Sequence, residues 1–125
     1  MDTLTLFDRL GGADGIGTLV DEIVAAHLAN PTISVRFQPY ASDPERLGEL
    51  KDHLRKFLMA GSGGPNAYAG RTMPEAHRGM NISVAEYMAA VDDIMEVLER
   101  NEIPESARKD VLAITYALKR DIVHH

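Results

Sequence analysis

The sequence predicts an all-α protein, and three observations support this fold class. Apolar residues recur at helical spacing in four long segments, and no useful length of chain alternates as a half-buried strand would. The 125 residues are 45% hydrophobic, which is enough for one compact core. No internal repeat, low-complexity tract or linker divides the chain. We therefore expect a single domain over residues 1–125.

The first elements follow from hydrophobic periodicity and from the residues that interrupt it. A short turn or helix is expected at residues 4–10, before the glycine pair at 11–12. The next segment carries one apolar stripe and stops at Asn30. The stripe comprises Ile16, Leu19, Val20, Ile23, Val24 and His27. His27 is the polar exception on that face.

Three further helices are predicted along the rest of the chain. The segment from 44 to 59 places Leu47, Leu50, Leu54, Phe57 and Leu58 within roughly 100° of arc, with His53 at the edge of that wedge. Ser83 and Glu86 form a capping box that starts the clearest helix. Its apolar face is Val84, Tyr87, Met88, Val91, Ile94, Met95 and Leu98. The last helix begins near Pro104 and carries Ala107, Val111, Ile114, Leu118 and Ile122 on one side.

A Gly- and Pro-rich stretch from 60 to 74 separates these helices and leads directly to His77. Continued helix is improbable there because of the glycines and prolines. Loops longer than about 12 residues without structure of their own are uncommon in small domains and are often functional. A large, flat, apolar cofactor would give both this loop and the facing apolar stripe a packing partner.

Composition excludes several functional classes. The net charge is −6 and no basic run interrupts it, so neither nucleic acid nor an anionic membrane is expected as a partner. The absence of cysteine excludes disulfides, thiolate metal sites, iron–sulfur clusters and thiol nucleophiles. No targeting segment is evident, and no window approaches the ~20 apolar residues that cross a bilayer. A soluble, cytoplasmic protein is expected.

The remaining site chemistry depends on histidine. Ser62, Ser83 and Ser106 each have a local turn or cap explanation, which argues against a Ser/His/Asp triad. The glycine clusters lack the preceding strand and following lysine of a phosphate loop. Zinc needs three or four ligands at short spacing, and His27, His53 and His77 lie far apart. Haem needs one neutral imidazole and an apolar slot, although any single histidine could equally be a surface or hydrogen-bonded core residue.

Several motifs together give a family resemblance over almost the whole chain. They are LFDRLGG near the start, LANP at a helix end, Phe37, and the stretch KFLMAGSGGPNAYAGRTMPEAHRGMNIS. The last contains GGP, Y-x-G-R-x-M and A-H-x-G-x-x-I at family spacing. With these motifs the sequence resembles the truncated haemoglobins of group I, which implies a shortened globin with a two-over-two helical sandwich around haem.

The resemblance implies a role for individual residues. His77 would be the proximal iron ligand, with its Nδ1–H held by a backbone carbonyl. Phe37 would pack on the porphyrin, and Arg71 and Lys51 would pair with its propionates unless they are ordinary surface cations. The other implied pocket-lining positions are Leu50, Leu54, Phe57, Leu58, Met73, Ile82, Tyr87 and Val91. Apolar residues at this spacing would otherwise be read as ordinary core.

The chain departs from the family pattern on the distal side. Val24 and Leu54 stand where many members have the tyrosine and glutamine that hydrogen-bond oxygen, so strong oxygen storage is not expected. The distal pocket is expected to comprise Val24, Leu50, His53 and Leu54. His53 is a candidate second axial ligand, or it points outward to a haem propionate or solvent. His27 is a weaker candidate, the alternative being a ring tucked against a neighbouring helix and bonded to a carbonyl.

The resemblance also bears on the cofactor and on function. Leu118 replaces the histidine that can link covalently to haem, so non-covalent haem b is expected. The implied function is reversible binding of O2, CO and NO, with redox chemistry of the NO dioxygenase or nitrite reductase type that requires a reductant or reductase. The alternatives are a non-catalytic haem gas-sensor or electron-transfer module, and a helical interaction domain without a cofactor. We expect a monomer.

Overall fold

The computed structural model describes residues 4–64 and 72–125, and its regular structure in those ranges is helical. A single isolated bridge in these ranges pairs Ile82 with Val123. The helices are α1 (Leu6–Arg9), α2 (Gly12–Ala29), α3 (Ser34–Ala41), α4 (Pro44–Gly61), α5 (Met73–His77), α6 (Val84–Arg100) and α7 (Glu105–Ile122). The predicted all-α class is confirmed.

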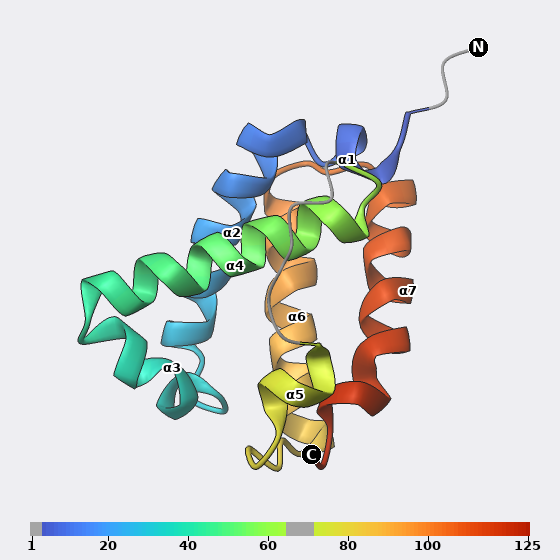
Figure 1. Cartoon of the computed structure of the whole chain (residues 1–125). Helices are drawn as coiled ribbons and strands as arrows, with labels where there is room; N and C mark the ends of the chain where they lie inside the picture. The colour runs from blue at the N-terminus through green and yellow to red at the C-terminus, as the bar shows by residue number, and fades with distance from the viewer. Residues whose placement is uncertain (1–3, 65–71) are drawn as a thin grey trace.

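The four long helices make up most of the molecule (Figure 1). Helix α2 packs on both α4 and α6, and α6 packs on α7. The short helix α3 joins the α2 and α4 pair, whereas α5 packs on α7. The two short helices that flank the predicted site are therefore held by different long helices.

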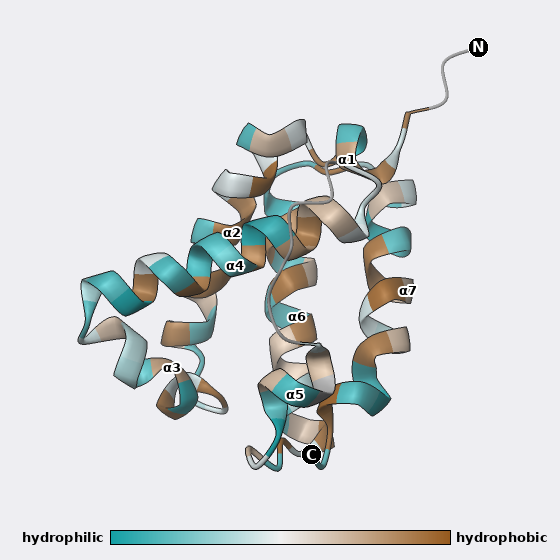
Figure 2. Cartoon of the chain, in the orientation of Figure 1, coloured by the Kyte–Doolittle hydropathy of each residue, from teal (hydrophilic) through white to brown (hydrophobic). Residues whose placement is uncertain are grey.

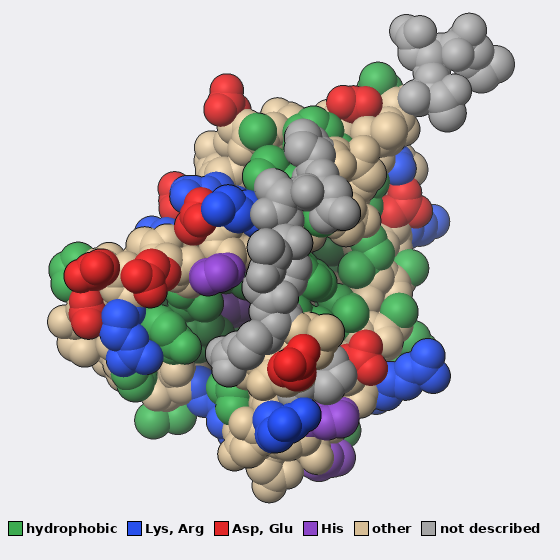
Figure 3. All heavy atoms as spheres, in the orientation of Figure 1, with side chains coloured by type: hydrophobic (Ala, Val, Ile, Leu, Met, Phe, Trp, Pro, Cys, Tyr) green, Lys and Arg blue, Asp and Glu red, His purple; other side chains and the backbone are tan. Residues whose placement is uncertain are grey.

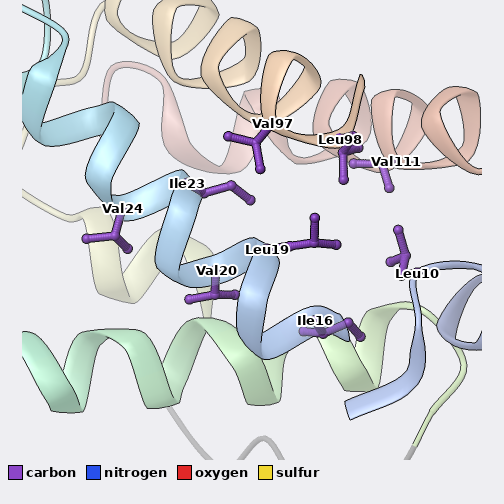
Figure 4. Close-up of a cluster of buried hydrophobic side chains, with 9 residues drawn as sticks. All are labelled: Leu10, Ile16, Leu19, Val20, Ile23, Val24, Val97, Leu98 and Val111. Atoms are coloured by element: carbon purple, nitrogen blue, oxygen red, sulfur yellow. The ribbon is translucent and has the colours of Figure 1, made fainter. Parts of the chain in front are cut away.

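The main core lies where α2 meets α4, α6 and the start of α7. Figure 4 shows its nine buried side chains, which are Leu10, Ile16, Leu19, Val20, Ile23, Val24, Val97, Leu98 and Val111. The brown, hydrophobic faces of these helices turn inward in Figure 2. Removing one such side chain from water contributes about 1.5–3 kcal/mol, so this cluster supplies much of the driving force for folding.

A second, smaller cluster lies near the other end of α6 and α7. Its buried members are Tyr87, Val91 and Ile122. Met73 from α5 and Ile82 from the following segment pack against them. Through Met73, this cluster holds α5 against α6 and α7.

Most predicted helices are confirmed. The buried residues of α2 are those of the predicted stripe, His27 included. Gly11 and Gly12 have φ of 96° and 70°, a left-handed backbone that glycine adopts without strain, at the predicted break, where α2 begins. Ser83 and Glu86 form both hydrogen bonds of the predicted capping box at α6.

Three details differ from the prediction. Helix α3 was not predicted, because it is only eight residues long and has Pro39 inside it. Val84 and Met88 on the predicted apolar face of α6 are 43% and 42% exposed. The stretch 60–74 begins as the last turn of α4 and ends in α5, and residues 65–71 lie outside the described residues. In the described parts of the chain, no helix is long and apolar enough to cross a membrane.

Candidate functional site

Helix α5, which carries His77, is started by a local capping box. The Thr72 hydroxyl accepts the backbone N–H of Glu75 at 3.4 Å, and the Glu75 carboxylate accepts the backbone N–H of Thr72 at 3.2 Å. This reciprocal capping box satisfies two donors at the helix start. The helix lasts five residues and ends at His77, and Gly79 with φ of 83° then turns the chain away.

The His77 ring is held by its own helix. Its Nδ1 lies 2.9 Å from the carbonyl oxygen of Met73, one turn earlier. A carbonyl can only accept a hydrogen bond, so Nδ1 is the donor and a neutral ring carries its lone pair on Nε2. Among the described residues, Nε2 has no hydrogen-bond partner. The half-buried imidazole is thus oriented with one nitrogen available for a ligand.

The C-terminus of the chain supports the segment that follows His77. The Asn81 backbone N–H donates to the His125 carbonyl at 2.6 Å, and the His124 N–H donates to the Ile82 carbonyl at 2.9 Å. Asn81 has φ of 47°, a left-handed conformation that asparagine tolerates better than most residues. These contacts tie the loop between α5 and α6 to the end of α7.

Helix α4 carries the predicted residues of the opposite side. It begins at an Asp43 cap, whose carboxylate accepts the N–H groups of Glu45 and Arg46. None of its described residues is fully buried, although it has a clear apolar face. Its predicted apolar pocket residues are half-buried, namely Leu50, Leu54, Phe57 and Leu58. An apolar face left only half covered is the kind of surface that a flat cofactor can complete.

Seven of the predicted lining residues belong to one of the two hydrophobic clusters or pack against it, whereas Phe37, Leu50 and Phe57 are in neither cluster. Val24, Leu54 and Leu58 belong to the main core or pack against it. Met73, Ile82, Tyr87 and Val91 form part of the second cluster. In Figure 3, hydrophobic side chains gather in a hollow between α4 and α5. His53 is exposed on α4, and Arg71 lies outside the described residues.

Helix α3 adds Phe37 to the α4 side. Its half-buried ring lies 5.1 Å from the ring of His27, centroid to centroid, at an interplanar angle of 31°. The Nζ of Lys51, predicted as a candidate partner of a haem propionate, lies 3.4 Å from a carboxylate oxygen of Asp21. In this structure that cation is engaged with α2.

Tyr87 is a predicted lining residue whose pKa is shifted. Burial raises the pKa of its phenol, and the negative charge of Asp121 raises this pKa further. Its hydroxyl donates to the Thr115 carbonyl at 2.5 Å, which links α6 to α7. Tyr87 is therefore neutral at physiological pH and presents an apolar ring to its cluster.

Sequence reasoning missed Asp93 and Asn30. Asp93 is buried on α6, where it accepts hydrogen bonds from His27 and Asn30. The tucked position expected as the alternative for His27 is present, but its partner is this carboxylate and not a carbonyl. Asp93 lies four residues before the fully buried Val97 and shares its helical face, but Val97 was not on the predicted apolar face, so no signal in the sequence indicated this burial.

The described residues do not contain a protein-built metal site. No three histidine, aspartate or glutamate side chains within 4–64 and 72–125 gather where they could hold a bare ion. A single oriented imidazole beside apolar faces suits a metal whose other ligands come from a macrocycle.

Comparisons with known proteins agree with this arrangement. The family model described as "Bacterial-like globin" matches residues 5–124. The group 1 truncated hemoglobin GlbN of Synechocystis sp. is 26% identical over 126 residues, covering 96% of this chain and 98% of that protein. GlbN of a Nostoc species is 30% identical over 94 residues, covering 75% of each chain.

Solved structures show the same fold. Truncated hemoglobin from Tetrahymena pyriformis in the Fe(III) form superposes with a TM-score of 0.88 at 21% identity, covering 98% of this chain and all of that one. The group II truncated hemoglobin from Bacillus anthracis gives a TM-score of 0.84 at 23% identity, covering 99% of this chain and 94% of that one. The fold alone thus matches both groups, whereas the two relatives found by sequence above are named group 1 truncated hemoglobins. The chain belongs to the bacterial-like globin family, as a truncated haemoglobin of group I.

Proposed function

We propose that this chain binds haem b non-covalently, with His77 as the proximal ligand, and that the bound haem reversibly binds O2, CO and NO. The orientation of the His77 ring carries this proposal. Its Nδ1–H is committed to the Met73 carbonyl, and Nε2 has no partner among the described residues. Histidines that bind metals are commonly oriented by such a hydrogen bond to the other nitrogen.

The surroundings of His77 support haem over a smaller ligand. The half-buried apolar face of α4 and the Tyr87 cluster belong to different parts of the fold, so a large flat group could complete both. Phe37, Leu50 and Phe57 would supply ring contacts from the α4 side. Leu118 packs in the second cluster and offers no nucleophile, which supports non-covalent binding. Bound haem supplies an iron centre that binds diatomic gases and exchanges one electron.

The apolar distal positions determine which gases are favoured. Val24, Leu50 and Leu54 offer no hydrogen-bond donor. Loss of such a donor typically weakens oxygen binding by about 1–3 kcal/mol, and CO and NO depend on it less. We therefore propose redox chemistry of the NO dioxygenase or nitrite reductase type in preference to oxygen storage, with a reductant or reductase restoring the iron. The alternative is a non-catalytic gas-sensor or electron-transfer module, which a second axial histidine at His53 would favour.

An absorption spectrum of the purified protein with haem tests the proposal. We expect a Soret band from bound haem, its loss in His77→Ala, and its retention in His124→Asn. His124 is an exposed control with φ of 62°, and asparagine tolerates that conformation. A His77→Ala protein that kept the coordination spectrum of the unsubstituted protein would overturn the assignment.

A second measurement separates the enzyme from the alternative module. In one assay the reduced protein is mixed with NO in the presence of oxygen, and nitrate is measured. In the other it is mixed with nitrite without oxygen, and NO is measured. Both assays contain an added reductant and run over several turnovers. Sustained turnover supports the enzyme. A single stoichiometric reaction, with no turnover when reductant is present, supports the sensor or electron-transfer module.

A further inference from the structure

A buried polar cluster joins α2 to α6 and has no part in the function proposed above. Nδ1 of His27 lies 2.8 Å from Oδ2 of Asp93, and Nδ2 of Asn30 lies 3.2 Å from each oxygen of the same carboxylate. His27 is 6% exposed and Asp93 is 9% exposed. Burying these groups costs several kcal/mol before their mutual bonds offset it.

The cluster orients the His27 ring. An ionised carboxylate only accepts hydrogen bonds, so Nδ1 is the donor and the ring cannot flip without losing this bond. Among the described residues, Nε2 of His27 has no partner. Every fully buried side-chain nitrogen or oxygen in the described ranges does have one. The Nε2 atom is therefore not fully enclosed by other protein atoms.

The His27 ring lies beside Phe37, which is expected to pack on the porphyrin, and one helical turn after Val24, which is assigned to the distal pocket. The His27 ring contacts the Phe37 ring at 5.1 Å between centroids. Val24 lies one turn earlier on the same buried stripe of α2. Since Val24 is apolar, the ring of His27 provides the polar atom on this stretch of the helix.

A purely structural role explains the cluster less well. An apolar pair of similar volume would join α2 to α6 at least as firmly, because buried ion pairs rarely add net stability. The carboxylate end also faces outward, since Asn30 and Asp93 line a surface pocket of about 310 Å³ together with Arg100. The pair thus runs from a solvent-accessible pocket to the interior beside Phe37.

We propose that His27, held in place by Asp93, is the polar positioning residue of the distal side and sets the electric field that acts on a gas bound there. This inference rests on the proposed function. It assigns to His27 the electrostatic influence on the gas that Val24 and Leu54 cannot exert. Asp93 acts through His27, both by fixing its ring and by its charge.

The test is the infrared C–O stretching frequency of the CO complex, which responds to the local field and does not depend on turnover. His27→Phe keeps an aromatic ring against Phe37 and removes the polar nitrogen. Asp93→Asn keeps an acceptor for Nδ1–H and removes the charge. Asp92→Asn, an exposed neighbour on the same helix, is the matched control. We expect the band to shift in His27→Phe and in Asp93→Asn, and to stay in place in Asp92→Asn.

The double variant separates an electrostatic role from a structural one. If Asp93 acts through His27, Asp93→Asn will cause no further shift in the His27→Phe background. An equal shift of the band with and without His27 would overturn the inference, as would an unchanged band in both single variants. Should His27→Phe fail to fold, the single Asp93→Asn variant decides by the presence or absence of its shift. Absence of any Soret band in the unsubstituted protein would instead show that the proposed function had failed, and the inference with it.

Discussion

Arg36 on α3 and Glu86 at the start of α6 form an ion pair with two hydrogen bonds. Nε of Arg36 donates to Oε2 of Glu86 at 2.5 Å, and Nη2 donates to Oε1 at 3.1 Å. The same carboxylate accepts the backbone N–H of Ser83 at 3.0 Å. One side chain therefore caps α6 and also anchors the helix that carries Phe37.

This ion pair predicts a loss of stability in acid. The hydrogen bond from Arg36, followed by that from the Ser83 backbone, lowers the pKa of Glu86 from 4.5 to about 2. A carboxylate with a depressed pKa stabilises the fold above its unfolded pKa, and this contribution is lost as the pH falls from about 4.5 towards 2. Both side chains are partly exposed, at 26% and 21%, so screening limits the expected contribution to about 1–2 kcal/mol.

Urea unfolding at pH 7 and pH 3 measures this contribution. Glu86→Gln keeps an oxygen for the Ser83 N–H and loses the charge, so we expect it to be less stable at pH 7 and to lose less stability on acidification than the unsubstituted protein. Glu99→Gln alters an exposed carboxylate on the same helix and is the control. Equal losses between pH 7 and 3 in the Glu86→Gln variant and in the unsubstituted protein would contradict the prediction.

Two helical glycines should respond in opposite ways to alanine. A Cβ at Gly15 in α2 would lie 2.4 Å from the Leu10 carbonyl oxygen, so the backbone would have to move. We expect Gly15→Ala to destabilise the protein by about 1–3 kcal/mol. A Cβ at Gly48 in α4 would meet nothing within 4 Å, and Gly48→Ala should stabilise the protein by about 0.5–1 kcal/mol. Thermal or urea unfolding of both variants checks this, and a shift of the same sign in both would refute it.

The Tyr87 phenol should ionise at a higher pH than an ordinary tyrosine, and its contribution to stability should be lost in alkali. Burial and the Asp121 charge raise its pKa above 10.0, so the fold favours the neutral phenol. The stabilisation is complete below the unfolded pKa of about 10 and is lost as the pH rises through the folded pKa. An ultraviolet titration of phenolate should show a phase at high pH that Tyr87→Phe removes. Tyr116→Phe, at a tyrosine 74% exposed, should leave that phase unchanged.

The elements that depend on local sequence were predictable. The stripe of α2 was predicted because helical periodicity reports directly on burial. The Ser83 and Glu86 cap was predicted because both partners lie within one turn. The hydrogen bond from His77 to a backbone carbonyl, implied by the family resemblance, is also local and is present.

Contacts between distant residues were not predictable in this way. The bond between Arg36 and Glu86 spans 50 positions and that between His27 and Asp93 spans 66, so neither pair leaves a periodic signal. A polarity pattern assigns Asp93 to the solvent, because a charged residue is buried only when a specific partner offsets the cost. That partner lies on another helix. The exposure of Val84 and Met88 was missed for a related reason, since periodicity marks an apolar face but not what covers it.

The last prediction concerns His53, the proposed second axial ligand. It lies on α4 between Leu50 and Leu54, and its side chain is exposed in this structure. If it binds iron, a gas must first displace it, so the observed affinity equals the intrinsic affinity multiplied by the fraction of protein in which that position is open. We expect six-coordinate visible bands in the resting protein, and we expect His53→Ala to convert them to a five-coordinate spectrum.

Stopped-flow CO binding gives an independent check of this competition. In the unsubstituted protein the rate should level off at high CO, because dissociation of His53 becomes limiting, whereas in His53→Ala it should rise linearly with CO. His124→Asn removes an imidazole elsewhere and should behave as the unsubstituted protein does. A five-coordinate ferrous spectrum before any substitution would exclude a bis-histidine resting state. It would leave His77 as the proposed ligand and favour the gas-binding enzyme over the electron-transfer module.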